Sequence, residues 1–311
     1  MNQLNIKLFG KFSIEFEKQV LRGFDSRKVQ ELFFYLLMYR DRPHSRETLA
    51  SLLWKENSTS QSKKYLRQAL WQLQNALQKQ AQSNEQSLLL IEAEWIQINP
   101  QAHISLDVES FEKAYEAARG LRGRELNAPQ LHALERAARL YEADLLSGWY
   151  QDWCLYERER LENMCLAILD KLMAYCEAHG NYEAGLIYGT RILNFDCARE
   201  RTHRRIMRLY YLSGDRTAAL RQYTRCAEAL DEELSVKPAK LTEELYAIVS
   251  EDLPISSYRE KSIFVAGKRE TRVHLPKVMV HLKQLQGILD DVQKHVKKDI
   301  ETIENTLKSQ S

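Results

Sequence analysis

The residues best suited to chemistry fall on one face of a predicted helix over residues 61–79. Three cations able to neutralise phosphate groups stand near its start: Lys63, Lys64 and Arg67. Side chains able to hydrogen-bond to base edges or stack on bases follow: Gln68, Trp71, Gln72 and Asn75. At 100° per residue this polar face lies opposite four apolar positions: Leu66, Leu70, Leu73 and Leu77. The segment predicts a helix that contacts a polyanion.

Taken alone, this pattern has a simpler interpretation. Lys63, Lys64 and Arg67 would also suit an ordinary solvated helix face, and Trp71 either contacts a base or sugar or partly covers a neighbouring sheet. The choice depends on the elements that surround the helix.

Two shorter helices are predicted before it. Residues 26–40 carry apolar side chains at helical spacing: Val29, Leu32, Phe33, Leu36 and Leu37. Ser45 is suited to cap a second helix whose apolar positions are Leu49, Leu52 and Leu53. Arg27, Lys28 and Arg46, near the starts of these helices, are candidates for holding a nucleic-acid backbone in register.

Strand patterns flank the three helices. Apolar and polar residues alternate on both sides of Gly10 between Leu4 and Phe16, which predicts a hairpin. A second hairpin is predicted from residues 88–91 and 95–98, with Glu92, Ala93 and Glu94 at its tip. A sheet, three helices and a hairpin form the order of a winged helix-turn-helix, whose last helix enters the major groove of DNA.

Length and charge agree with this organisation. The 311 residues suffice for about two domains, and the net charge is +2. The charge is uneven, however: between Arg22 and Lys79, 11 basic residues stand against 5 acidic ones. Double-stranded DNA is therefore the expected partner of the first 100 residues.

The middle of the chain repeats itself. At an offset of 34 residues, the period of TPR helix pairs, Gly180 aligns with Gly214 and Ala184 with Ala218. Each glycine stands between two helical patterns, where a left-handed turn is expected. Residues 101–253 thus predict a TPR-like helical domain, which could also bind an unknown ligand or protein.

A family resemblance rests on these same segments. Four segments resemble the OmpR-type DNA-binding domain of SARP regulators: LFGKFSIEF, SRKVQELFFYLL, SRETLASLLW and YLRQALWQLQNAL. The stretches at 104–111 and 229–238 resemble the two ends of the activator domain of the same regulators. The resemblance implies a mainly α fold: an N-terminal winged helix-turn-helix (1–100) with small β-sheets and three helices, then a TPR-like bacterial transcriptional activator domain (101–253). It also implies that the protein activates transcription and that RNA polymerase contacts the loop Lys55–Ser60.

Two features depart from that family. Leu73-Gln74-Asn75 stands where arginines are usual, and the predicted hairpin tip is acidic instead of basic or glycine-rich. These features favour an alternative, a TPR-type interaction scaffold whose winged helix docks protein instead of DNA. The basic excess over residues 22–79 opposes it.

The remaining residues predict a linker and a long helix. Residues 254–277 contain Pro254, Gly267 and Pro276 and a basic run, which is typical of a linker. Residues 278–311 carry a nearly heptad apolar seam from Val278 to Leu307, which predicts either a coiled-coil homodimer or a helix folded back on its own chain.

Several function classes receive no support from the sequence. We find no nucleophile and base pair, no metal-ligand spacing and no phosphate-binding glycine loop, so we expect neither an enzyme nor a cofactor. Five scattered cysteines form no disulfide framework, and no apolar run is long enough to span a membrane. We therefore expect a cytoplasmic protein.

Overall fold

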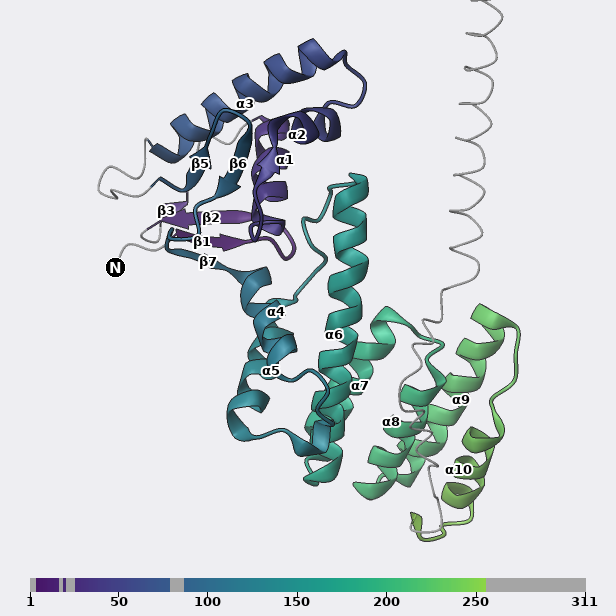
Figure 1. The fold of residues 1–311 in the computed structure, drawn as a ribbon. Helices are drawn as coiled ribbons and strands as arrows, with labels where there is room; N and C mark the ends of the chain where they lie inside the picture. The colour runs from purple at the N-terminus through teal and green to yellow at the C-terminus, as the bar shows by residue number, and fades with distance from the viewer. Residues whose placement is uncertain (1–3, 17–18, 21–25, 79–86, 256–311) are drawn as a thin grey trace, which may run out of the picture. The chain divides into compact units, whose positions relative to one another are not determined.

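The computed structural model describes residues 4–16, 19–20, 26–78 and 87–255. The linker beyond residue 255 and the helix predicted at 278–311 lie outside these residues. The described chain is mainly helical after an N-terminal region of small sheets and three helices, as predicted (Figure 1).

The N-terminal region contains two sheets and three helices. Its strands are β1 (Leu4–Lys7), β2 (Ser13–Phe16), β3 (Gln19–Val20), β4 (His44–Ser45), β5 (Leu89–Ile91) and β6 (Trp95–Ile98). Its helices are α1 (Arg27–Met38), α2 (Arg46–Leu53) and α3 (Thr59–Gln78). Both predicted hairpins are present, β1 with β2 and β5 with β6. Strand β4 extends the second hairpin into a sheet of order β4-β6-β5.

The helical region follows directly. Its elements are β7 (Ile104–Leu106), α4 (Asp107–Ala117), a 3-10 turn (Gly123–Glu125), α5 (Ala128–Leu140), α6 (Asp152–Ala178), α7 (Tyr182–Phe195), α8 (Glu200–Leu212), α9 (Arg216–Leu234) and α10 (Lys240–Ser250). The pairs α6/α7 and α8/α9 turn at Gly180 and Gly214, whose φ angles of 72° and 86° are the left-handed conformation expected there. The 34-residue repeat is therefore confirmed as two helix hairpins.

Three strands were not predicted: β3, β4 and β7. Strand β7 stands at the start of the helical region, yet it pairs in parallel with β1 and gives the first sheet the order β3-β2-β1-β7. Its three residues are too few to show a period of two in the sequence. This pairing joins the winged-helix region to the helical region through backbone hydrogen bonds.

A buried carboxylate strengthens the same junction. Asp107, the first residue of α4, accepts hydrogen bonds from the backbone N–H groups of Leu8 (2.8 Å), Phe9 (3.0 Å) and Val108 (2.7 Å). Burial raises the pKa of this carboxyl group, and the three N–H donors oppose the rise. Asp107 thus satisfies backbone donors of the N-terminal region from within the helical region.

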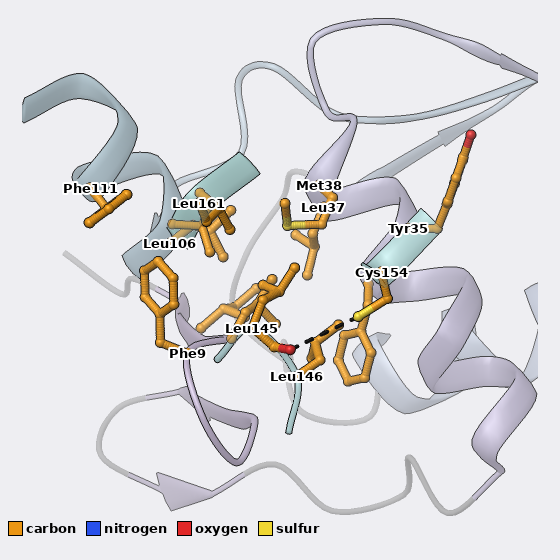
Figure 2. Close-up of a cluster of buried hydrophobic side chains, with 14 of the residues drawn as sticks. Phe9, Tyr35, Leu37, Met38, Leu106, Phe111, Leu145, Leu146, Cys154 and Leu161 are labelled. Atoms are coloured by element: carbon orange, nitrogen blue, oxygen red, sulfur yellow. Dashed lines mark hydrogen bonds between the residues drawn. The ribbon is translucent and has the colours of Figure 1, made fainter. Parts of the chain in front are cut away.

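Apolar side chains from both regions fill one core. Figure 2 shows Tyr35, Leu37 and Met38 of α1 in the same cluster as side chains of the helical region: Leu106, Phe111, Leu145, Leu146, Cys154 and Leu161. Two tryptophans extend this contact, since Phe34 packs edge-on against Trp149 and Tyr35 against Trp153, with ring centroids 5.3 and 5.5 Å apart. Both sides of α1 are therefore covered.

The cysteines of α6 belong to this core. Cys154, Cys165 and Cys176 are buried. Burial raises the pKa of Cys154 to about 11 and that of Cys165 to about 12, so both stay protonated thiols at neutral pH. They act as packing residues and not as nucleophiles.

The Asp107 junction predicts a stability effect. Asp107→Ala would leave the buried N–H groups of Leu8 and Phe9 without an acceptor, so we expect a loss of about 2–4 kcal/mol in the free energy of unfolding. Asp107→Asn keeps one acceptor oxygen and should lose less. Urea denaturation measures both changes.

The matched control is Glu116→Ala, which removes an exposed carboxylate from the same helix. We expect its effect to stay within about 0.5 kcal/mol. Equal stability of the Asp107 and Glu116 variants would contradict a structural role for the junction.

Candidate nucleic-acid interface

Helix α3 is held by an apolar face and by one buried hydroxyl group. Leu66, Leu70 and Leu73 are at most 3% exposed and pack against the rest of the winged-helix region. Ser62, on the same face, is also buried, and its hydroxyl donates to the carbonyl oxygen of Trp54 at 3.1 Å. This bond fixes the start of α3 against the end of α2.

The opposite face of α3 is open to solvent. Lys64, Arg67, Gln68 and Trp71 are exposed and recur three or four residues apart, so they form one stripe along the helix. Trp71 is 64% exposed, so its indole does not act mainly as a cover for the sheet. Gln72 and Asn75 are half-buried at the border of this stripe. Helix α3 packs against α1 and α2 (Figure 1).

The charge of this stripe is uncompensated. Helix α3 contains Lys63, Lys64 and Arg67 and no acidic residue. Lys63 pairs with Glu47 of α2 at 3.0 Å, whereas Lys64 and Arg67 form no ion pair with any residue that the structure describes. Two cations on one exposed helix face can therefore neutralise phosphates without first breaking an internal pair.

The other predicted contacts have internal partners. Arg27 donates to the carbonyl oxygen of Gly148 at 3.0 Å, and its guanidinium lies 4.8 Å from the Trp149 ring centroid. Lys28 donates to the carboxylate of Glu31 at 2.8 Å and to the carbonyl oxygen of Leu53 at 2.6 Å. Both cations help to hold α1 in place.

Arg46 links α2 to the tip of the β5–β6 hairpin. Its guanidinium donates to the carbonyl oxygen of Glu92 at 3.1 Å, and its backbone N–H donates to that of Glu94 at 2.9 Å. Glu92 and Glu94 themselves are exposed. The acidic tip is thus tied beside the start of α2, where its carboxylates would repel a phosphate backbone.

Sequence reasoning missed the residues that position this face. Ser62 was overlooked because a serine near the beginning of a helix is usually read as a capping residue. Its position four residues before Leu66 places it on the inward-facing side of the helix. Trp149 and Trp153, which pack against α1, were also missed. Their contacts join elements distant in sequence, which no local pattern indicates.

The described residues show no metal or membrane chemistry. No cluster of three or more potential metal ligands occurs among them. Within the same residues, no helix is both long and apolar enough to cross a bilayer.

Comparison with known proteins assigns the helical region. Residues 106–249 match the family described as bacterial transcriptional activator domain. The activator domain predicted from the sequence is therefore confirmed over these residues. No curated protein matches the chain in sequence.

A solved structure shares the fold. Mycobacterium tuberculosis EmbR, in complex with a low affinity phosphopeptide, superposes with a TM-score of 0.58 at 19% identity. The match covers 82% of this chain and 66% of the EmbR chain, so this chain spans slightly less than two thirds of that relative. The chain therefore contains a region that matches a bacterial transcriptional activator domain, and its small sheets and helices are arranged as in EmbR.

Proposed function

We propose that the protein is a sequence-specific DNA-binding activator of transcription. Residues 1–100 bind promoter DNA, and residues 101–253 form the activator region. The observation that carries the proposal is the exposed stripe of α3, which places Lys64 and Arg67 beside Gln68 and Trp71. Neither Lys64 nor Arg67 pairs with an acidic group of the described chain. Such a regulator works in the cytoplasm, where bacterial DNA lies.

The contacts have different tasks. Lys63, Lys64 and Arg67 neutralise phosphates, while Gln68, Gln72 and Asn75 meet base edges in the major groove. Trp71 stacks on a sugar or base. Arg27, Lys28 and Arg46 all have internal hydrogen bonds, so any phosphate contact that they make is additional to a structural one.

RNA polymerase is the second proposed partner. The predicted contact segment Lys55–Ser60, which comprises the loop after α2 and the first two residues of α3, is exposed throughout. It stands at the start of the proposed recognition helix, so a protein bound to this loop would lie next to the DNA. The family resemblance places polymerase contact at the same loop.

The phosphate contacts predict a change in salt dependence. With Lys64→Ala and Arg67→Ala together, the slope of log affinity against log salt on any duplex should flatten by about 1.8, at roughly 0.9 for each phosphate that is no longer neutralised. Fluorescence anisotropy with a random duplex at several salt concentrations measures it. Both side chains are exposed, so thermal stability should stay unchanged.

The matched control is Lys113→Ala with Arg119→Ala, which removes the same amount of charge from α4 and the turn that follows it. It should leave the slope as in the wild type. If the slope flattens equally in both double variants, the effect reflects the net charge of the protein and not contacts of α3. If the slope changes in neither, the result favours the alternative in which the winged helix docks protein instead of DNA.

The amides predict selective readout. Glutamine pairs bidentately with adenine, so Gln68→Ala should lose about 1–3 kcal/mol of binding free energy on the preferred site and much less on unrelated DNA. The preferred site is first found by sequencing DNA that co-purifies with the protein. An equal loss on both duplexes would mean that α3 does not read sequence.

We propose also that residues 278–311 form a homodimer, because two linked half-site contacts would offset the weak binding of one arginine-poor helix. Removing residues 275–311 should convert a dimer into a monomer in light scattering and weaken binding to a two-half-site operator by about 100-fold. A truncated protein with unchanged oligomeric state and lower thermal stability would instead indicate a helix folded on its own chain.

A further inference from the structure

Three consecutive residues of α3 spread across its exposed face. Successive side chains on an α-helix are about 100° apart around the axis. Lys64 lies in the middle of the exposed face, Lys63 lies at one edge and Tyr65 lies at the other. All three residues are exposed.

The two edges of this face differ in charge. Arg67 lies about 60° from Lys64 on the same side as Lys63, so the cations of α3 occupy the middle and one edge. Gln72 falls within about 20° of Tyr65 at the other edge. Helix α3 contains no further charged residue, so the Tyr65 edge is neutral.

A helix in the major groove faces the phosphate backbones of both strands. The groove is about 12 Å wide and a helix with its side chains is about 10–12 Å across, so each edge of the helix meets one backbone. If the charged edge of α3 faces one strand, the neutral edge faces the other. A phosphate contact at the neutral edge then requires an uncharged hydrogen-bond donor, and a tyrosine hydroxyl group is one.

The ring of Tyr65 has a support, whereas its hydroxyl group has no internal partner. Tyr65 is 38% exposed, and its ring lies beside that of Trp54, with centroids 6.5 Å apart and planes inclined by 34°. The carbonyl oxygen of Trp54 accepts from Ser62, which ties this support to α3 itself. The hydroxyl group forms no hydrogen bond with any residue that the structure describes. A supported tyrosine with a free hydroxyl group loses little entropy when it binds.

We propose that Tyr65 donates a hydrogen bond from its hydroxyl group to a phosphate oxygen of the DNA strand opposite the one that Arg67 contacts. This contact rests on the proposed function and extends it from one backbone to both. Phosphate contacts carry no sequence information, so Tyr65 sets the position of α3 in the groove and leaves base readout to the amides.

Tyr65→Phe tests the contact in the full chain, because it removes the hydroxyl group and keeps the ring beside Trp54. Affinity should fall about 10-fold on both the preferred site and a random duplex, the effect of losing a hydrogen bond to a charged group. The slope of log affinity against log salt should stay unchanged, because a phenol neutralises no phosphate and so releases no counterion. Fluorescence anisotropy measures both quantities.

The matched control is Tyr156→Phe, which removes a hydroxyl group from an exposed tyrosine of α6. Its affinity for DNA should stay within about twofold of the wild type. Thermal stability should be unchanged in both variants, so a loss of binding by Tyr65→Phe cannot be assigned to unfolding.

Neutral phosphates locate the contact. A methylphosphonate group replaces one phosphate at a time in each strand of the preferred site. The substitution that removes the partner of Tyr65 should weaken the wild type about 10-fold and cause no further loss in Tyr65→Phe. The substitutions that cause no further loss in Arg67→Ala should lie on the other strand.

Three results would overturn this inference. Tyr65→Phe could bind both duplexes as tightly as the wild type, or its partner phosphate could lie on the same strand as that of Arg67. In the third, Tyr65→Phe binds DNA normally but activates transcription less in a reconstituted reaction, which would make Tyr65 a polymerase contact. In each case the salt slope of Lys64→Ala with Arg67→Ala still tests DNA binding by α3, so the two proposals fail separately.

Discussion

Burial of helix α1 on all its sides is the constraint on which the rest of the structure depends. From Glu31 to Met38 every residue is buried, so the helix serves two neighbours at once. One side packs inside the winged helix, and the other meets Trp149 and Trp153. The winged-helix and helical regions therefore share one core and are coupled in stability, instead of being linked only by a flexible connection.

This shared core explains how the basic residues are distributed. Arg27 and Lys28 stand where α1 meets its neighbours, and their N–H groups satisfy carbonyl oxygens at that contact. Lys64 and Arg67 lie on the exposed face of α3 and form no ion pair with any described residue. A count of charges over residues 22–79 treats these cations alike, although only some of them are available to a polyanion.

The junction also combines polar and apolar surface in an unusual way. Backbone pairing of β1 with β7, the Asp107 carboxylate and the hydrogen bond from Leu146 N–H to the carbonyl oxygen of Leu8 close one side of it. On the other side, α1, the turn after α2 and the start of α6 leave a cavity, and two of its lining residues, Gln151 and Trp153, each have a buried polar atom that no described residue satisfies. The two regions thus meet through hydrogen bonds on one side and around a cavity on the other.

The sequence by itself determined the two hairpins, the three N-terminal helices and the paired helices of the activator domain. Alternation near Gly10, leucine spacing in α3 and the 34-residue repeat are local patterns, and each predicted a hairpin, a helix or a helix pair that the structure contains. Only the tertiary structure decided which polar residues are free. Whether Lys28 faces solvent or a carbonyl oxygen, and whether Trp153 Nε1 finds an acceptor, depends on segments more than twenty residues away. Periodicity reports which face of an element is buried, but it carries no information about which distant element covers that face.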